Sequence, residues 1–319
     1  MTSLPEFKGW LAHGWGIEAK TPQQALDLIS HIALLAQGRT YAWRGQSDAS
    51  YKLSSSLYRR LEKPGEPVTE KALRAEENKI LEEARRWGLG RDLGPSATDL
   101  HLLALLQHHG VPTRLLDVTS DPMTALWFAA EQRISADALT GDPAGVLFAI
   151  DVTDTDWFQT FQHHGTQSWN EIGNPLSAVY ETALDDSAKT QKMFRAFPAL
   201  PDERMKAQGG YFLGSAFPKN HQVPGVIGFK PGGAAPGDSK LQKLLKQDRG
   251  PGRLAKLPFC AIVIPADVKK EAARSAQTNV QPSASGAFSG YRRIQGSSPQ
   301  RTAGRLTLSR KRGNYARTH

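Results

Sequence analysis

The sequence has a single cysteine and no apolar run long enough to span a bilayer. With one thiol, Cys260, an internal disulfide is excluded, as is usual for proteins of reducing compartments. The longest apolar stretches, residues 257–266 and 145–152, fall short of the ~20 residues that a spanning helix needs. Residues 1–10 lack a basic segment followed by an apolar run. We therefore predict a cytoplasmic protein that is not inserted in a membrane.

Several catalytic signatures are missing as well. The sequence has no glycine-rich loop ending in Lys-Ser or Lys-Thr, and no Gly-x-Gly-x-x-Gly segment after an expected strand. The run Ser54–Ser56 lacks the glycines of a nucleophile elbow, which disfavours serine hydrolase chemistry. The tandem histidines at residues 108–109 and 163–164 have no cysteine or acidic ligand at a familiar spacing. We therefore predict no metal site.

Acidic residues are absent from residues 290–319, which contain eight of the 40 Lys and Arg residues. The rest of the chain has 32 basic and 31 acidic residues, so the formal net charge of +9 belongs mainly to this end. A segment rich in Ser, Gly and Arg cannot bury enough apolar surface to offset its ordering entropy, so we expect a disordered basic tail over residues 267–319. Its charge suits nucleic-acid contact, and a solvated end without a specific partner is the alternative.

The body of the chain alternates between helical and strand patterns. Thr21 before Pro22, and Thr69 before an acidic turn, are typical N-caps, while Gly110 is placed to end a helix in the left-handed conformation. Helical spacing is found over residues 22–35, 70–86, 99–109 and 122–132, and strand patterns over residues 40–43, 146–152 and 259–264. These elements predict an α+β fold.

We expect one domain with a mixed, split β-sheet flanked by helices. It would occupy residues 20–266, after an N-terminal extension over residues 1–19 and before the basic tail. Prolines and glycines crowd residues 224–253, which indicates a loop excursion carrying one or two helical turns inside the domain.

Polar and ionisable groups interrupt the apolar pattern at three separated stretches. These are residues 43–46, residues 107–117 and residues 204–209. Because an unmatched buried polar group costs roughly 1–3 kcal/mol, side chains of this kind are tolerated where they meet partners. The three stretches therefore predict one shared pocket.

The same stretches resemble the FRG domain. The resemblance rests on Tyr41-Ala42-Trp43-Arg44-Gly45-Gln46, on the run from Ala104 to Ala129 with its Pro-Thr-Arg-Leu-Leu-Asp centre, and on residues 204–212. It extends over roughly residues 20–266. Because FRG domains occur mainly in bacterial and phage proteins, often in defence-like contexts, the resemblance implies a bacterial toxin or phage-defence effector.

The order of these features is also similar to the ADP-ribosyltransferase superfamily, in which the same three places hold NAD as substrate. This similarity implies that the guanidinium of Arg44 anchors the phosphates or ribose, and that Gly45 admits the nicotinamide amide. Thr119 and Ser120 would lie against the nicotinamide ribose. The implied NAD-binding set is Arg44, Gly45, Gln46, Thr113, Arg114, Thr119 and Ser120.

At the third place the sequence has Gln208, where the superfamily commonly has a glutamate. A neutral amide can hydrogen-bond a ribose hydroxyl, but it cannot take a proton as a carboxylate does. Glu203 or Asp117 would then supply the carboxylate, unless the acceptor is nucleophilic enough to need none. The catalytic set implied by the similarity is Arg44, Gln208, Asp117 and Glu203.

The same residues also have a structural interpretation. Arg44 and Asp117 would form a buried ion pair that joins two segments, with Arg114 as part of the scaffold, and Gln208 would satisfy backbone groups. The functional hypothesis is an NAD-dependent ADP-ribosyltransferase-like enzyme, with a protein or nucleic acid as acceptor and a neutralising partner protein. The rival hypothesis is a non-enzymatic domain that recognises a nucleotide or nucleic acid.

Overall fold

The computed structural model describes residues 8–12, 14–35, 38–93, 98–132, 142–157, 178–197, 203–219, 223–231, 241 and 257–279. The expected basic tail beyond residue 279, and most of the loop excursion over residues 224–253, lie outside these ranges.

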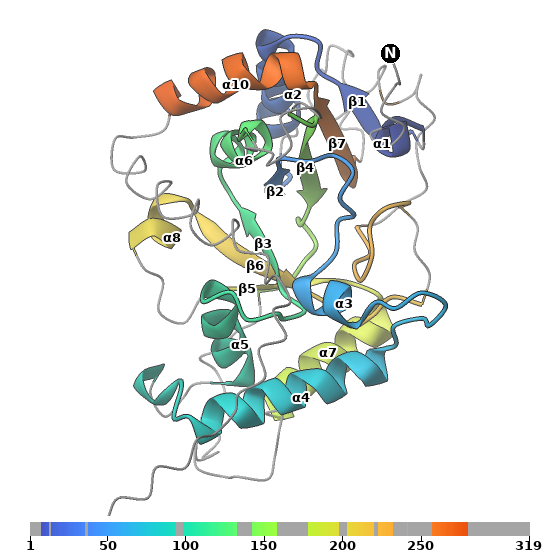
Figure 1. The fold of residues 1–319 in the computed structure, drawn as a ribbon, viewed down its shortest axis with the longest axis vertical. Coiled ribbons are helices and arrows are strands. Elements are labelled where there is room, and N and C mark those ends of the chain that lie inside the picture. Colours follow the sequence, from blue (N-terminus) through green and yellow to red (C-terminus); the bar gives the residue numbers. More distant parts are fainter. Residues whose placement is uncertain are drawn as a thin grey trace, which may run out of the picture.

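Seven strands of the described residues form one mixed sheet, with helices on either side of it (Figure 1). Their order across the sheet is β1-β7-β4-β2-β3-β6-β5. β1 runs parallel to β7, and the other neighbours are antiparallel. The strands are β1 (Gly16–Glu18), β2 (Tyr41–Gln46), β3 (Leu116–Thr119), β4 (Gly145–Asp151), β5 (Phe194–Ala196), β6 (Gly210–Gly214) and β7 (Phe259–Ile264). The predicted mixed sheet flanked by helices is confirmed.

Of the neighbouring strands in the sheet, β2 and β3 share the fewest registered residue pairs. These two strands share one registered pair, Trp43 with Thr119, whereas β2 pairs with β4 along its whole length from Tyr41 to Gln46. Past that pair, β2 and β3 diverge. The sheet therefore has two groups of strands that are joined at one place: β1, β7, β4 and β2 form one group, and β3, β6 and β5 form the other. The expected split is therefore present as a divergence within a sheet that stays continuous.

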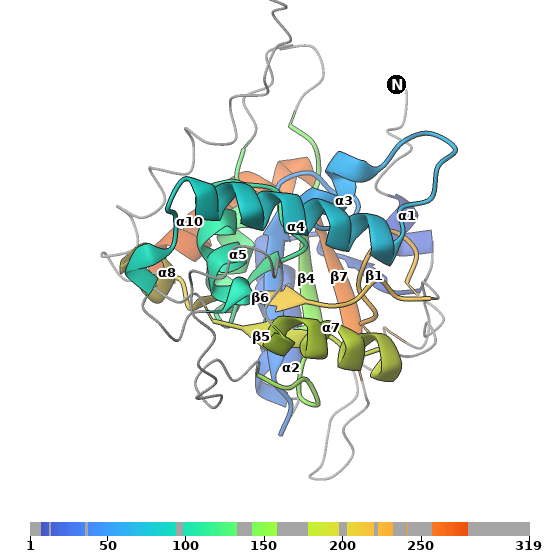
Figure 2. The ribbon, with the colours of Figure 1, turned by 90° about the horizontal axis from the view of Figure 1, so that it is seen from below.

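Two groups of helices lie at opposite ends of the molecule (Figure 1). α2, α6 and α10 lie together at one end, where α6 packs on β2, β3 and β4, and α10 packs on α6 and α2 (Figure 1). α4, α5 and α7 lie at the opposite end, and α4 and α7 face the viewer from below (Figure 2). The helices are α1 (Lys8–Ala12), α2 (Pro22–Leu35), α3 (Ser56–Leu61), α4 (Glu70–Arg86), α5 (Asp99–His108), α6 (Pro122–Ala130), α7 (Ala178–Thr190), α8 (Glu203–Ala207) and α10 (Ala266–Asn279), with a 3-10 turn at Arg91–Leu93.

Local signals in the sequence begin and end several of these helices. Thr69 accepts a hydrogen bond from the Ala72 N–H at the start of α4, as its N-cap pattern predicts. At the end of α5, Gly110 has a φ of 82°, a conformation that glycine adopts without a steric penalty. These two predictions are confirmed.

Both faces of the central strands are buried, which explains why their sequences are apolar without alternation. In β7, Cys260, Ile262 and Ile264 pack in the cluster beneath α2, α6 and α10. Their neighbours Ala261 and Val263 point into a second cluster on the other face, which includes Trp10 and Trp15. The sheet is therefore the middle layer of the domain.

The domain extends beyond both boundaries expected from the sequence. Residues 16–18, expected in an N-terminal extension, form the edge strand β1 beside β7, next to the fully buried Trp15. Residues 267–279, expected in the tail, are helical in α10, where Val268 and Ala272 are buried. In residues 267–279, the apolar residues that pack on the domain stand among many polar ones, and β1 has only three residues, so neither segment has a strong pattern of its own.

The start of α5 has a pH-sensitive hydrogen bond. The Thr98 N–H donates to His101 Nδ1 at 3.0 Å, which requires this nitrogen to be unprotonated. Burial lowers the pKa of His101 below its ordinary value of 6.5. Below about pH 6.5, His101 is therefore protonated more readily in the unfolded chain than in the folded chain. The free energy of unfolding falls as the pH decreases.

We expect stability to fall by about 1 kcal/mol, the net worth of one hydrogen bond, when the pH drops from 7.5 to about 5.5. Urea unfolding at both pH values, for the native chain and for His101→Gln, measures the effect. The glutamine can still accept from Thr98 N–H but does not titrate, so the variant should lose this part of the pH dependence. Equal pH dependence in both proteins would contradict the assignment.

Candidate functional site

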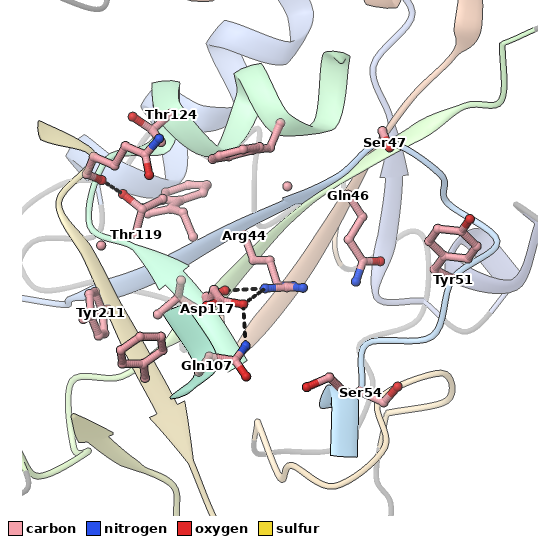
Figure 3. A pocket seen from close by; sticks show the side chains of 18 of the residues that line it. Arg44, Gln46, Ser47, Tyr51, Ser54, Gln107, Asp117, Thr119, Thr124 and Tyr211 are labelled. Atoms are coloured by element: carbon pink, nitrogen blue, oxygen red, sulfur yellow. Dashed lines mark hydrogen bonds and ion pairs between the residues drawn. The ribbon is translucent and has the colours of Figure 1, made fainter. Parts of the chain in front are cut away.

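A cavity of about 750 Å³ opens where β2 and β3 diverge. Arg44 and Gln46 reach it from β2, and Asp117 and Thr119 reach it from β3 (Figure 3). Gln208, in the turn before β6, lines the same cavity. The structure thus brings the three polar stretches of the sequence together at the place where the sheet leaves room between its strands.

A chain of hydrogen bonds fixes the centre of the cavity. Arg44 Nη1 donates to the Asp117 carbonyl oxygen at 2.5 Å and lies 3.6 Å from Asp117 Oδ2 (Figure 3). Gln107 Nε2 donates to the same carboxylate at 2.9 Å, and Thr113 Oγ1 donates to Gln107 Oε1 at 2.8 Å. Arg44 and Asp117 do form the predicted ion pair that joins two segments, but the pair is not buried as expected. The Asp117 side chain keeps 48% of its surface exposed, so it can still meet a ligand.

The turn before β6 is held against the end of β3. Thr119 Oγ1 donates to the Gln208 carbonyl oxygen, and Ser120 N–H donates to the Gly209 carbonyl oxygen at 3.0 Å. Gly209 has a φ of 55°, and a Cβ there would lie 2.6 Å from Ser120 Oγ. Glycine at this position therefore lets the turn pack closely, with the Gln208 side chain at the cavity.

Some buried polar atoms of the cavity residues have no hydrogen-bond partner within the described part of the chain. These atoms are Arg44 Nε, Gln46 Oε1, Ser54 Oγ and Gln208 Nε2. An unmatched buried group costs about 1–3 kcal/mol, and here donors and acceptors from several segments lie around one space. This arrangement suits a ligand with several polar groups.

Aromatic side chains form much of the remaining wall. Trp43, Phe128 and Tyr211 line the cavity, and Tyr51 lies near its opening with 46% of its surface exposed. Burial raises the pKa of Tyr211 to about 12, so this phenol stays neutral. Flat apolar surfaces of this kind can hold a ring system, while the polar atoms fix its orientation.

Gly45 has a packing role that the sequence analysis did not foresee. A Cβ at this position would overlap the Ala125 carbonyl oxygen and lie 2.5 Å from the Ala129 N–H nitrogen. The missing side chain therefore lets α6 lie directly on β2. Gly45 also lines the cavity. Its contact with a nicotinamide amide, which the superfamily similarity implies, stays a prediction.

We expect Gly45→Ala to lower the free energy of unfolding by at least about 2 kcal/mol, because the added methyl group meets backbone atoms of α6. Thermal and urea unfolding measure the change. Gly9→Ala is the matched control, since Gly9 lies in α1 with open space around its Cβ position, and it should be neutral or stabilising by up to about 1 kcal/mol. Equal effects of both substitutions would refute the packing role.

Four of the residues predicted for the site lie outside the cavity lining. Arg114 is 2% exposed and donates to Glu77 and Glu70, and Thr113 is fully buried. Ser120 contacts the turn at Gly209. The Glu203 side chain is 92% exposed and pairs with Lys206. Arg114 therefore lies in a buried scaffold, which matches the structural interpretation of this residue.

The structure adds charged residues that the sequence analysis missed. Lys52, Arg59, Glu62 and Glu131 all line the cavity. Lys52 donates to Glu62 at 2.9 Å, which raises the pKa of the lysine. No sequence signal marks these residues, because they lie in ordinary polar positions between 47 and 62 and at the end of α6. Glu62 and Glu131 add two carboxylates to the site.

Helix α10 supports the side of the cavity formed by Ser47 and Glu131, which we call the rim. Lys269 of α10 is fully buried, and its ammonium donates to the Ser47 carbonyl oxygen at 2.6 Å and to the Glu131 carbonyl oxygen at 3.3 Å. It also forms an ion pair with Asp142 at 3.1 Å. The rim therefore depends on a residue far along the chain.

Residues 39–138 match the family model of the FRG domain. This range contains β2, α3, α4, α5, β3 and α6, and with them Arg44, Arg59 and Asp117 of the cavity, while Gln208 lies outside it. The predicted FRG resemblance is thus confirmed over these residues. No curated protein and no solved structure matches the chain. The similarity to ADP-ribosyltransferases stays a prediction.

Two negative findings concern the described ranges alone. None of their helices combines the length and the apolar character needed to cross a membrane. Within them, no three His, Cys, Asp or Glu side chains are grouped as a metal ion would require.

Proposed function

We propose that this chain, which carries an FRG domain over residues 39–138, binds NAD in the cavity between β2 and β3 and transfers its ADP-ribose to an acceptor. The observation that carries the proposal is the meeting of Arg44 and Gln208 at one cavity, although 163 positions separate them in the sequence. A toxin or phage-defence role is part of the same proposal.

Arg44 is suited to the phosphates of a dinucleotide. Its contacts with Asp117 both use Nη1, and its buried Nε has no partner within the described residues. A guanidinium donates from several nitrogens in one plane, so it can hold Asp117 with one nitrogen and phosphate oxygens with others. The fixed carbonyl and carboxylate of Asp117 would keep this fork in place before the ligand arrives.

Gln208 is suited to a ribose hydroxyl. Its Nε2 is buried without a partner within the described residues, while its backbone is held by Thr119. An amide can donate to a hydroxyl oxygen and accept from another hydroxyl. The aromatic wall formed by Trp43, Phe128 and Tyr211 would receive the nicotinamide ring.

In the proposed reaction, the bond between the nicotinamide nitrogen and C1′ of the ribose breaks, and nicotinamide leaves with the bonding electrons. The nucleophile of the acceptor forms a new bond to C1′, and its proton passes to a carboxylate. Among the described residues, the carboxylates that line the cavity are those of Asp117, Glu62 and Glu131, whereas Glu203 lies outside the lining. Asp117 is held by Arg44 and Gln107, and Glu62 is paired with Lys52, so a carboxylate that takes this proton would do so from within an existing set of contacts.

The rival function is nucleotide recognition without turnover. The neutral side chain of Gln208 favours it, because this side chain faces the cavity at the place where a carboxylate would be expected for catalysis. Under this alternative, Arg44 and the aromatic wall would bind the nucleotide in the same way.

Incubation of the full chain with NAD, alone and with cell extract, tests the proposal. Chromatography measures released nicotinamide, labelled NAD reports transfer to an acceptor, and calorimetry measures binding. Release of nicotinamide or a labelled acceptor supports the enzyme. Binding of NAD without either product supports the recognition domain, and the absence of binding and of both products excludes both uses of NAD.

A further inference from the structure

The cavity contains an arginine, Arg59, that forms no ion pair with another described residue. Arg59 of α3 lines the cavity, and Nη1 donates to the Ser54 carbonyl oxygen at 2.5 Å. Among the described residues it has no ion-pair partner within 4.0 Å, whereas Arg44 pairs with Asp117 and Lys52 with Glu62. Arg59 therefore presents a positive charge to the cavity.

A second positively charged side chain, that of Arg44, lines the same cavity as Arg59. The pKa of Arg59 is lowered from its ordinary value by burial of the guanidinium and then by repulsion from Arg44, while Asp117 offsets part of this effect. The Asp117 carboxylate thus attracts the guanidinium groups of both Arg44 and Arg59. An anion bound between the two guanidinium groups would relieve their repulsion.

A buried hydroxyl completes the arrangement. Ser54 is 1% exposed, lines the cavity, and its Oγ has no hydrogen-bond partner among the described residues. In Figure 3 the side chains of Arg44, Gln46 and Ser54 surround the same open space. The Arg59 contact with the Ser54 carbonyl places the guanidinium beside this residue.

We propose that Arg59, Ser54 Oγ and Arg44 form a subsite for a diphosphate group. Two guanidinium groups match the two negative charges of a diphosphate, and the serine hydroxyl can donate to a further phosphate oxygen. A ligand with a single carboxylate would match the subsite less well than a diphosphate, because it would offer one charge and two oxygens to these three groups. The proposal rests on the proposed function for its ligand, since it assigns the pyrophosphate of NAD to this subsite.

The adjacent Arg60 provides a matched control. It lies on the same helix, its side chain is 53% exposed, and it pairs with Glu76 of α4 outside the cavity lining. Loss of a charge-assisted contact typically weakens binding by about 10- to 100-fold. Arg59→Leu should therefore lose about this much affinity for ADP, while Arg60→Leu should bind as the native chain does.

Ser54→Ala separates binding from stability. Because Ser54 Oγ has no partner in the described residues, its removal costs no internal hydrogen bond, and thermal unfolding should stay unchanged or rise slightly. Affinity for ADP should still fall by about 2- to 10-fold, the usual effect of one neutral hydrogen bond. A fall in stability with unchanged affinity would assign Ser54 to the scaffold.

Calorimetry on the full chain with inorganic pyrophosphate, ADP, NAD and adenosine tests the subsite. We expect pyrophosphate and ADP to bind, adenosine to bind far more weakly, and the affinities of the first two to depend on Arg59. The subsite is refuted if native protein binds neither pyrophosphate nor ADP, or if Arg59→Leu binds ADP as well as Arg60→Leu does.

The outcomes also distinguish the subsite from the proposed function. If native protein consumes NAD while Arg59→Leu keeps full ADP affinity, the subsite is wrong and the enzyme stands. If ADP binds in an Arg59-dependent way while NAD is neither bound nor cleaved, the subsite stands and the NAD proposal fails.

Discussion

Replacing Arg114 with leucine is expected to lower the free energy of unfolding by about 3–5 kcal/mol, because it leaves a carboxylate buried without its partner. Arg114 Nη2 lies 2.6 Å from Glu77 Oε2, and Nη1 donates to Glu70 Oε1 at 3.0 Å. Glu77 is fully buried, and Tyr180 adds a hydrogen bond to it at 3.4 Å. Burial alone would lower the pKa of Arg114, but the attraction of Glu77 raises it above its ordinary value.

Urea unfolding measures this effect, with Arg86→Leu as the control. Arg86 lies on α4 like Glu77, is 77% exposed, and pairs with Glu82 at 3.6 Å, so its loss should cost less than about 1 kcal/mol. The double variant Arg114→Leu/Glu77→Leu should recover part of the lost stability, since it removes the unpaired charge. An Arg114→Leu variant as stable as the control would show that this cluster does not hold α4 to the sheet.

Replacing Arg44 with alanine is expected to weaken NAD binding about 100-fold and to abolish measurable NAD cleavage. The reason is that charge-assisted contacts to phosphate contribute about 1.5–3 kcal/mol each. Arg44→Lys should recover little, because an ammonium cannot hold Asp117 and a phosphate in the planar geometry of the guanidinium. Calorimetry with NAD, together with chromatography of nicotinamide, measures both quantities.

The control for Arg44 is again Arg60→Leu, which leaves the cavity unchanged. Thermal unfolding must accompany these assays, because Arg44 also joins β2 to β3 through Asp117. A folded Arg44→Ala variant that binds and cleaves NAD like the native chain would contradict the role assigned to this arginine.

Elements with strong local signals were predictable from the sequence. The Thr69 cap, the left-handed Gly110 and the apolar runs of β4 and β7 are set by residues within a few positions of each other. The meeting of the three polar stretches was also predictable, because each interrupts an apolar pattern that had to be buried. Arg44 and Asp117 were found in this way.

Other features depend on distant partners and leave no local signal in the sequence, so they were not predictable. β3 has four residues, and its position follows from β6 on one side and from the pair of Trp43 with Thr119 on the other. Gly45 is required by backbone atoms of α6, which contact it from another part of the chain. Arg59 looks like one of many exposed arginines until α3 is placed beside the cavity.

Lys269 has a practical consequence for anyone who shortens this protein. A fragment that stops at residue 266, as the apolar pattern alone suggests, would lose α10 and the ammonium that binds the Ser47 and Glu131 carbonyl oxygens. Such a fragment would test a damaged cavity, and its inactivity would say nothing about catalysis. Shortened versions should therefore keep the chain at least through residue 279.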